Sequence, residues 1–293
     1  VSDYNAIGEL IHHGVAEDLR EAARLSILAG VDIDMDSGAY SRYLAELVQS
    51  GEVPMELLDQ SVCRILRLKL ALGLFEQPFT DENLAEQVIL NADHRELALE
   101  VAQQSMVLIK NKAELLPLKP EHLRIALIGP LANNQVDLLG CWASAGRPED
   151  VETIYDGLRK YLPAEQILFH QGCSLTGDDA PDFAGALEAA RQADVILLAV
   201  GESRAMSGEA KSRAHLGLPG RQQELANALA ELGKPLVAVV LSGRPLVIPK
   251  LASQTDALLI AWHGGIRAGQ AIADILFGAA NPSGKLTVSW PRA

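Results

Sequence analysis

Apolar runs alternate with amphipathic segments from about residue 94 to the end of the chain. Runs rich in Val, Ile and Leu are typical of strands that are covered on both faces. They predict strands at about Arg124–Gly129, Gln166–His170, Asp194–Val200, Leu236–Leu241 and Ala257–Trp262, with an edge strand at Lys285–Trp290. Apolar positions at helical spacing predict helices at about His94–Asn111, Val151–Tyr161, Asp182–Gln192, Arg221–Leu232 and Gly269–Phe277. Such alternation indicates a mostly parallel sheet between two helical layers, so we expect 94–293 to form an α/β sandwich domain.

The first 75 residues follow a different pattern. Helical spacing predicts helices at Ala16–Leu28, Tyr40–Ser50 and about Pro54–Leu74. Between the first two, Val31, Ile33 and Met35 alternate with aspartates, which predicts a strand at 31–36. Because one strand cannot close a sheet, we expect residues 1–75 to be part of a larger domain. Residues 76–93 then form a linker.

Composition excludes some classes of function. A length of 293 residues favours about two domains. The net charge of −13 disfavours nucleic acid as a partner, since that requires a basic face. We expect no membrane span, because no apolar run reaches about 18 residues. The three cysteines lie far apart and form neither a metal-binding spacing nor a disulfide framework. The chain begins with Val1 rather than methionine, and we expect it to be an internal part of a longer protein.

The loop after the third predicted sandwich strand is the best candidate for chemistry. It begins at Gly201 and carries several charged side chains before Pro219, which we expect to open a helix. In an open α/β sheet, ligands bind beyond the carboxyl ends of the strands. Position alone leaves Glu202 and Glu209 equally good candidates for an acid. A nucleotide-binding protein is the competing class, but IALIGPLANNQ after the first sandwich strand lacks the glycine fingerprint.

The chain resembles the bacterial β-glucosidases of glycoside hydrolase family 3. The matching stretches, in family order, are VSDYNAI, SILAGVDIDM, ILRLKLALGLF, SMVLIKN, LPLK, VGESRAMSGEAKSR and AGQAIADILFGAANPSGKLTVSWP. The resemblance implies the carboxyl-terminal part of a (β/α)8 barrel at 1–75 followed by an α/β/α sandwich. It also implies that the barrel strands that hold the sugar hydroxyls lie upstream of Val1.

The resemblance assigns two carboxyl groups. Asp3 matches the aspartate of the family's SD[WY] motif and would be the nucleophile of a retaining glycosidase. By itself, a terminal aspartate would more often be frayed. Glu209 matches the glutamate of the sandwich-domain loop and would act as general acid and then as base. The same pattern leaves Glu202 as an ordinary solvated loop charge.

Four further residues are candidates for substrate contact: Tyr4, Met206, Arg213 and Trp262. Arg213 would orient the loop through a carboxylate or backbone contact, and a structural role remains an equal alternative. Trp142 is a weaker candidate for stacking on a sugar, because most tryptophans lie in the core. Asp34 and Asp36 are interpreted as solvated carboxylates rather than metal ligands. His263 stands where the family often has another aromatic residue.

The expected activity is retaining hydrolysis of terminal β-linked glucose from oligosaccharides or aryl glucosides, without a cofactor or metal. The partner is a small carbohydrate, and neither nucleic acid nor a membrane is expected. The alternatives are a catalytically incomplete fragment and a sugar-binding or partner module of the same fold. Because an open barrel piece exposes apolar faces, a partner chain, an upstream barrel segment or a homo-oligomer would have to cover them. The compartment stays open between the periplasm and the cytoplasm of a bacterium.

Overall fold

The chain divides into two compact units. The computed structural model describes residues 1–177 and 182–292, and its contacts separate Val1–Gln87 from Val88–Ala293. The division falls inside the segment 76–93 that the sequence predicts as a linker. Each unit has its own hydrophobic core.

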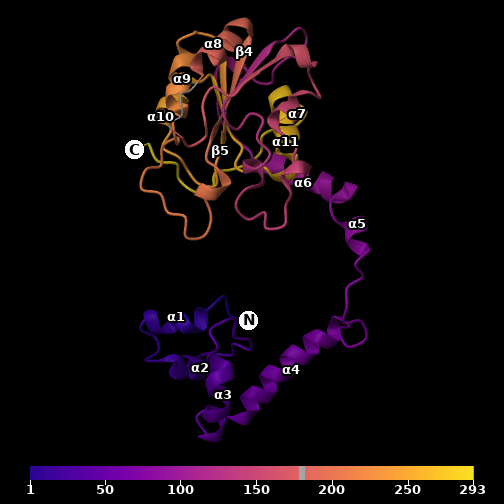
Figure 1. The fold of residues 1–293 in the computed structure, drawn as a ribbon, viewed down its shortest axis with the longest axis vertical. Helices are drawn as coiled ribbons and strands as arrows, with labels where there is room; N and C mark the ends of the chain where they lie inside the picture. Colours follow the sequence, from indigo (N-terminus) through magenta and orange to yellow (C-terminus); the bar gives the residue numbers. More distant parts are fainter. Residues whose placement is uncertain (178–181, 293) are drawn as a thin grey trace. The chain divides into compact units, whose positions relative to one another are not determined.

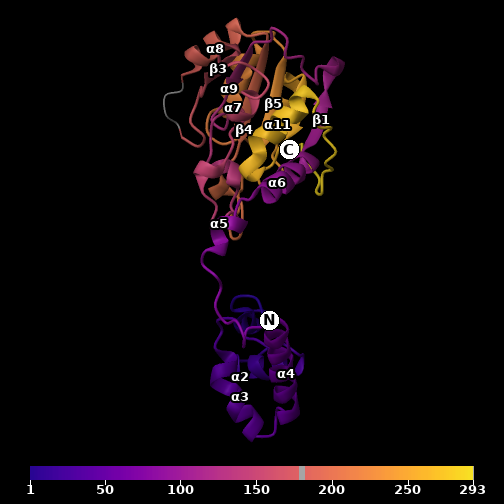
Figure 2. The ribbon, with the colours of Figure 1, turned by 90° about the vertical axis from the view of Figure 1, so that its right-hand side faces the viewer.

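The second unit contains one six-stranded sheet (Figures 1 and 2). Its strands are β1 (Val107–Asn111), β2 (Ile125–Ile128), β3 (Ile167–His170), β4 (Val195–Gly201), β5 (Leu236–Leu241) and β6 (Ala257–Ile260). Their order across the sheet is β1-β6-β5-β4-β2-β3, and all neighbouring pairs are parallel except β1 with β6. The predicted mostly parallel sheet is confirmed.

Helices cover both faces of this sheet. Figure 1 shows α6, α7 and α11 on one side and α8, α9 and α10 on the other. Their bounds are α6 Ala92–Ser105, α7 Ile154–Leu158, α8 Phe183–Gln192, α9 Gln222–Ala230, α10 Pro249–Gln254 and α11 Ala268–Phe277. Successive strand residues pack into opposite layers, so Leu197 joins the α7–α11 cluster while Ile196 and Leu198 join the α8–α9 cluster. This double burial explains the unbroken apolar runs.

Two predictions at the sheet edge were wrong. The expected helix to Asn111 ends at Ser105, because Met106 has extended backbone and the following residues pair with β6 as strand β1. The expected edge strand Lys285–Trp290 is not a strand. Gly284 N donates to Met106 O at 3.0 Å, but no ladder follows among the described residues, because residues 285–289 are exposed and do not pack along the sheet.

Helix boundaries near the sheet also differ from expectation. Pro219 does not open α9, which begins at Gln222, because Gly220 has φ +57° and breaks the helical path between them. The short helix α10 was not predicted. It has proline at its first position, which suits a helix start because that residue needs no backbone N–H partner there.

The first unit is helical throughout its described elements. It contains α1 (Ala6–His12), α2 (Leu19–Leu28), α3 (Ala39–Gln49) and α4 (Met55–Ala71), and α5 (Leu84–Val88) spans the boundary. Its core comprises Ile7, Ala16, Ala22, Ala23, Ile27, Ala39, Leu47 and Val53. The predicted strand 31–36 is extended but is not a strand. Its backbone bonds to Ser2, Asn5 and Ser26, and within the described residues these bonds do not extend into a strand ladder.

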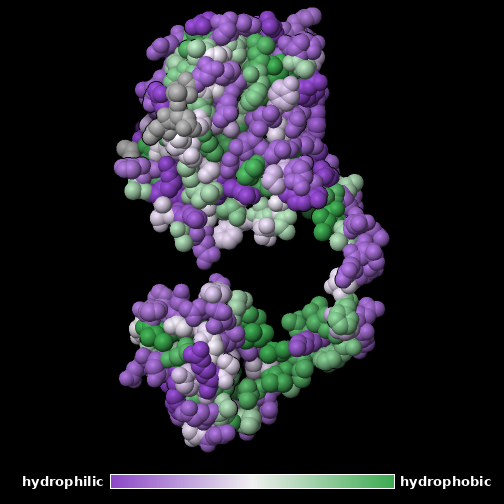
Figure 3. Space-filling view, in the orientation of Figure 1, coloured by the Kyte–Doolittle hydropathy of each residue, from purple (hydrophilic) through white to green (hydrophobic). Residues whose placement is uncertain are grey.

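Helix α4 keeps an exposed apolar face. Val62, Leu68 and Leu70 are 45%, 61% and 58% exposed, and only Ser61 of this helix is buried. Figure 3 shows this apolar surface running along the helix. An uncovered face of this kind is what the sequence predicts for an open piece of a barrel. Even so, no helix of the described residues combines the length and apolarity that a membrane span requires.

Candidate active site

The sheet order fixes where a ligand would bind in the second unit. Strand β2 pairs with both β3 and β4, so the chain leaves β2 toward one edge and returns to its other side as β4. The connections at such a reversal diverge and leave a crevice beyond the carboxyl ends of the two strands. The loops after β2 and β4 meet there, since Arg204 N donates to Asp137 Oδ1 at 2.8 Å.

The end of β4 is held by backbone geometry and by one buried amide. Gly201 has φ +146°, and an added Cβ would lie 1.7 Å from Leu241 O, so only glycine fits between the strands. The buried Gln222 side chain binds both backbone groups of Gly201, at 2.8 and 2.9 Å, and donates to Leu175 O at 2.9 Å. The loop therefore starts from a fixed point.

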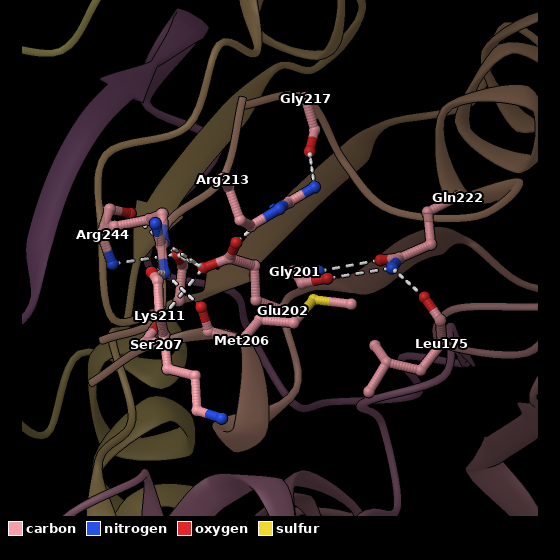
Figure 4. A network of polar contacts seen from close by, with 11 residues as sticks. Leu175, Gly201, Glu202, Met206, Ser207, Lys211, Arg213, Gly217, Gln222 and Arg244 are labelled. Carbon is pink, nitrogen blue, oxygen red and sulfur yellow. Dashed lines mark hydrogen bonds and ion pairs between the residues drawn. The ribbon is translucent and has the colours of Figure 1, made fainter. Parts of the chain in front are cut away.

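Glu202, the first residue after β4, is the centre of a polar cluster (Figure 4). Its side chain has no exposed surface. The Glu202 carboxylate accepts hydrogen bonds from Arg213 Nη1, from Ser242 Oγ at 2.9 Å and from Ser207 Oγ at 3.2 Å. Arg244 Nε lies 3.4 Å from Oε2. The interpretation of Glu202 as a solvated loop charge was wrong, because two guanidinium groups make its burial tolerable.

The two arginines extend this cluster into the loop. Arg213 Nη2 donates to Gly217 O at 3.3 Å, so Arg213 makes both the carboxylate and the backbone contact that loop orientation requires. Arg244 Nη2 donates to Met206 O and, at 2.7 Å, to Lys211 O. Sequence reasoning missed Arg244. Its position just after β5 could have identified it, because β4 and β5 are adjacent and parallel.

Glu209 stands apart from this cluster. Its side chain is exposed, between Gly208 at φ +115° and Ala210 at φ +57°, a tight path that presents Glu209 to solvent. It lines a pocket of about 200 Å³ together with Cys141, Trp142, Ser207, Gly208 and Lys211. The loop that Glu202 fixes thus presents a free carboxyl group at the crevice.

Trp142 does not occupy the core position that is usual for tryptophan. It is 75% exposed and comes from the loop after β2 into the same pocket as Glu209. Trp262, the favoured tryptophan, lies just beyond β6 with φ +55°. Its ring packs edge-on against Trp290 at 6.0 Å between centroids, and its Nε1 donates to Ser105 O at 3.1 Å. Substrate contact by Trp262 stays a prediction.

His263 adjoins the cluster, with both ring nitrogens buried. Burial lowers its pKa, and this effect outweighs the opposing influence of Asp137 and Glu202. The imidazole is therefore neutral near pH 7. A Cβ at Gly140 would lie 3.1 Å from that of His263, so the loop after β2 packs directly on this residue.

Asp3 belongs to the first unit and is not frayed. Ser2 N and Asn5 N donate to Ile33 O and Met35 O at 2.9 and 2.8 Å, and Ser2 Oγ accepts from Met35 N at 2.8 Å. Asp3 itself is exposed, with Tyr4 N donating to its Oδ1 at 2.7 Å. A backbone fixed on both sides of an exposed carboxylate suits a nucleophile.

The side chains around Asp3 are also partly ordered. Tyr4 is 68% exposed, and a side-chain hydrogen bond with Asp36 raises the pKa of its phenol. Asp34 accepts from Ser37 Oγ at 2.5 Å and from Tyr40 N at 3.2 Å, at the start of α3. Asp34 therefore has a structural role. Within residues 1–177 and 182–292, no group of three His, Cys, Asp or Glu side chains is placed to hold a metal ion.

Comparison with known families agrees with this architecture. Residues 106–293 match the glycosyl hydrolase family 3 C-terminal domain, and residues 1–68 match the N-terminal domain of the same family. The two matches fall in separate units of the structure.

Individual relatives are longer than this chain. All of it aligns at 41% identity with 42% of a periplasmic β-glucosidase from Salmonella typhimurium, and at 36% identity with 42% of a β-xylosidase from Formosa agariphila. The crystal structure of a β-glucosidase from Listeria innocua matches 99% of the chain with a TM-score of 0.91 and 40% identity, over 40% of its own length. The chain thus spans about two fifths of the curated relatives it matches.

The match of the C-terminal domain model covers most of the chain, and the N-terminal model accounts for most of what precedes it. Both agree with the parallel sheet and with the helices of the first unit. The chain belongs to glycosyl hydrolase family 3.

Proposed function

We propose that this chain carries the catalytic carboxyl groups of a retaining β-glycosidase of the β-glucosidase type. Asp3 is the nucleophile and Glu209 the acid/base. The observation that carries the proposal is the position of Glu209, exposed on a loop at the crevice beyond β2 and β4. Relatives named β-glucosidase and β-xylosidase support the reaction class.

The proposed reaction has two steps. Asp3 attacks the anomeric carbon and forms a glycosyl ester while Glu209 gives its proton to the leaving oxygen. Glu209 then takes a proton from water, which attacks the same carbon and releases the sugar with Asp3 restored. Net β-configuration is kept because each step inverts the anomeric centre. Glu202 has no part in these two steps, since its buried carboxylate is paired with two arginines.

Trp142 supplies the leaving-group side of the site in this proposal. Its exposed indole lies in the pocket that holds Glu209, where a sugar or aryl ring can pack against it. Solved structures titled as complexes of the Listeria innocua enzyme contain glucose, laminaribiose and isofagomine. These ligands favour glucose among the sugars that the proposal allows.

The substrate-binding groups of the barrel are proposed to come from the segment that the longer relatives carry. The exposed apolar face of α4 supports this, because the remaining barrel would cover it. The same observation favours one alternative, in which the chain alone is catalytically incomplete. If no covalent intermediate is found, the remaining interpretation is a sugar-binding or partner module.

The proposal is tested by trapping the intermediate with a 2-deoxy-2-fluoro-β-glucosyl fluoride, followed by peptide mass spectrometry. The reagent is applied to this chain and to a barrel-completed chimera, in which the barrel region of the Listeria innocua relative precedes Val1. An adduct on the peptide that contains Asp3, absent from Asp3→Asn, supports the assignment. Labelling of the Listeria enzyme but of no residue in the chimera would refute it. Labelling of the chimera alone would show that this chain is incomplete by itself.

A further inference from the structure

Two cationic side chains of the loop that carries Glu209 have no hydrogen-bond or ion-pair partner among the described residues. Arg204 and Lys211 line a pocket of about 330 Å³, and among the described residues neither charged group makes a hydrogen bond or ion pair. Arg213 and Arg244, the other two arginines of this region, both form ion pairs with Glu202. Figure 4 shows the Lys211 side chain extending away from that cluster. We call the space lined by Arg204 and Lys211 the basic pocket.

The acidic groups nearby do not neutralise the basic pocket. The Glu202 carboxylate already forms ion pairs with two guanidinium groups. Asp137 accepts from Asn134 Nδ2 and from the backbone N–H of Arg204, each at 2.8 Å. Glu209 is exposed and lines the neighbouring pocket with Lys211, and among the described residues it makes no ion pair. Among the described residues, the lining of the basic pocket contains two cations and no carboxylate, in a chain whose net charge is −13.

The basic pocket is continuous with the pocket of Glu209. Cys141, Ser207 and Lys211 line both. A molecule whose scissile oxygen lies at Glu209 can therefore extend its leaving group along Lys211 to Arg204. The volume of the basic pocket falls in the range of small-molecule sites.

We infer that the basic pocket binds a carboxylate on the leaving group of the substrate, so that the chain selects glycosides of acidic aglycones, such as uronic or hydroxyaryl acids. The inference rests on the proposed function for the placement of the scissile bond. A planar guanidinium pairs with a carboxylate through two parallel hydrogen bonds, and an ammonium adds a point charge. Both groups are unpaired within the described part of the chain, so neither must leave a partner there to bind the acid.

Binding of the leaving group itself is the first test, and it requires no turnover. Calorimetry on this chain compares 4-hydroxybenzoate with 4-hydroxybenzamide, which has the same shape without the charge. We expect the acid to bind about ten-fold more tightly at low salt, the size of one charge-assisted contact. In the double variant Arg204→Gln/Lys211→Gln, the two affinities become equal. Lys119→Gln/Lys250→Gln removes the same charge elsewhere on the surface and keeps the preference.

Salt provides a check that does not depend on the variants. Because the two cations are partly exposed, raising ionic strength should shrink the acid-to-amide ratio in the unmodified chain. Equal affinities in the unmodified chain, undetectable binding of the acid, or an unchanged preference in the double variant would each overturn the inference.

Turnover by the barrel-completed chimera separates this inference from the proposed function. The substrates are 4-carboxyphenyl and 4-carbamoylphenyl β-glucosides. A higher kcat/KM for the charged substrate, lost in Arg204→Gln/Lys211→Gln, supports the basic pocket. Turnover of the carbamoyl substrate without preference for the acid would overturn the basic pocket and leave the proposed function standing. Absence of turnover on both, with selective binding of the acid intact, would contradict the proposed function alone.

Discussion

Oε2 of Glu202, a side chain without exposed surface, lies 3.4 Å from Nε of Arg244, which comes from the loop after the neighbouring strand. This ion pair joins the loops after β4 and β5 at the point where both leave the sheet. Together with the contact between Arg213 and Glu202, this ion pair holds the long polar loop after β4 in place. Several expectations depend on that support.

Replacing Glu202 by alanine should destabilise the second unit by about 3 kcal/mol, because it leaves two largely buried guanidinium groups without a counter-charge. Urea unfolding measures the difference. Glu188→Gln, which breaks an exposed pair with Arg191, is the control and should cost less than about 0.5 kcal/mol. Similar costs for both variants would show that the Glu202 cluster is not a structural centre.

Replacing Glu209 by alanine should leave stability unchanged, because the side chain is exposed and makes no hydrogen bond or ion pair within the described residues. In the barrel-completed chimera, hydrolysis of alkyl glucosides should fall far more than hydrolysis of activated aryl glucosides, which need little protonation. Azide should then yield the β-glucosyl azide. Equal losses on both substrate classes would remove Glu209 from the acid role.

Removing the Ser2 hydroxyl should loosen the segment that carries Asp3. In Ser2→Ala the Met35 N–H loses its acceptor, so we expect its amide to exchange with solvent about ten-fold faster. Hydrogen exchange on this chain reports the effect directly. Ser41→Ala, which removes a hydroxyl bonded to Gly38 O, should leave the Met35 amide unchanged.

Truncating Trp142 should weaken binding on the leaving-group side. We expect Trp142→Ala to raise KM for laminaribiose about five-fold in the barrel-completed chimera, the size of one aromatic stacking contact. Trp142→Phe keeps a ring in the same pocket and should recover most of the loss. An unchanged KM in the alanine variant would place the second sugar elsewhere.

His263 should make stability depend on pH. Burial lowers its pKa below 6.5 in the folded chain, so the unfolded state binds the proton more readily. Stability is therefore highest above pH 6.5 and falls as the pH drops from 6.5 toward the lowered folded pKa. Urea midpoints across this window should fall less in His263→Phe than in the unmodified chain. Parallel curves for the two proteins would mean that another group causes the loss.

The sequence anticipated elements whose burial is complete on both faces. The runs at β4 and β5 are apolar throughout, because helices cover both sides of the sheet, and they could be recognised without a structure. Prediction from the sequence failed at the edge of the sheet and in segments that no sheet covers. Val107–Asn111 continues a helical pattern yet pairs with β6. Residues 31–36 alternate like a strand but form no strand ladder within the described residues.

The sequence by itself determined the family, the order of the units and the two carboxyl groups proposed for catalysis, because these reside in contiguous motifs such as VSDYNAI and GEAKSR. Only the tertiary structure decided which loop charges are bound and which are free. Glu202 and Glu209 lie seven residues apart in one polar loop, and nothing local distinguishes their environments. The difference arises because Arg244 comes from the loop after another strand, 42 residues beyond Glu202, and pairing across the sheet cannot be read from local sequence.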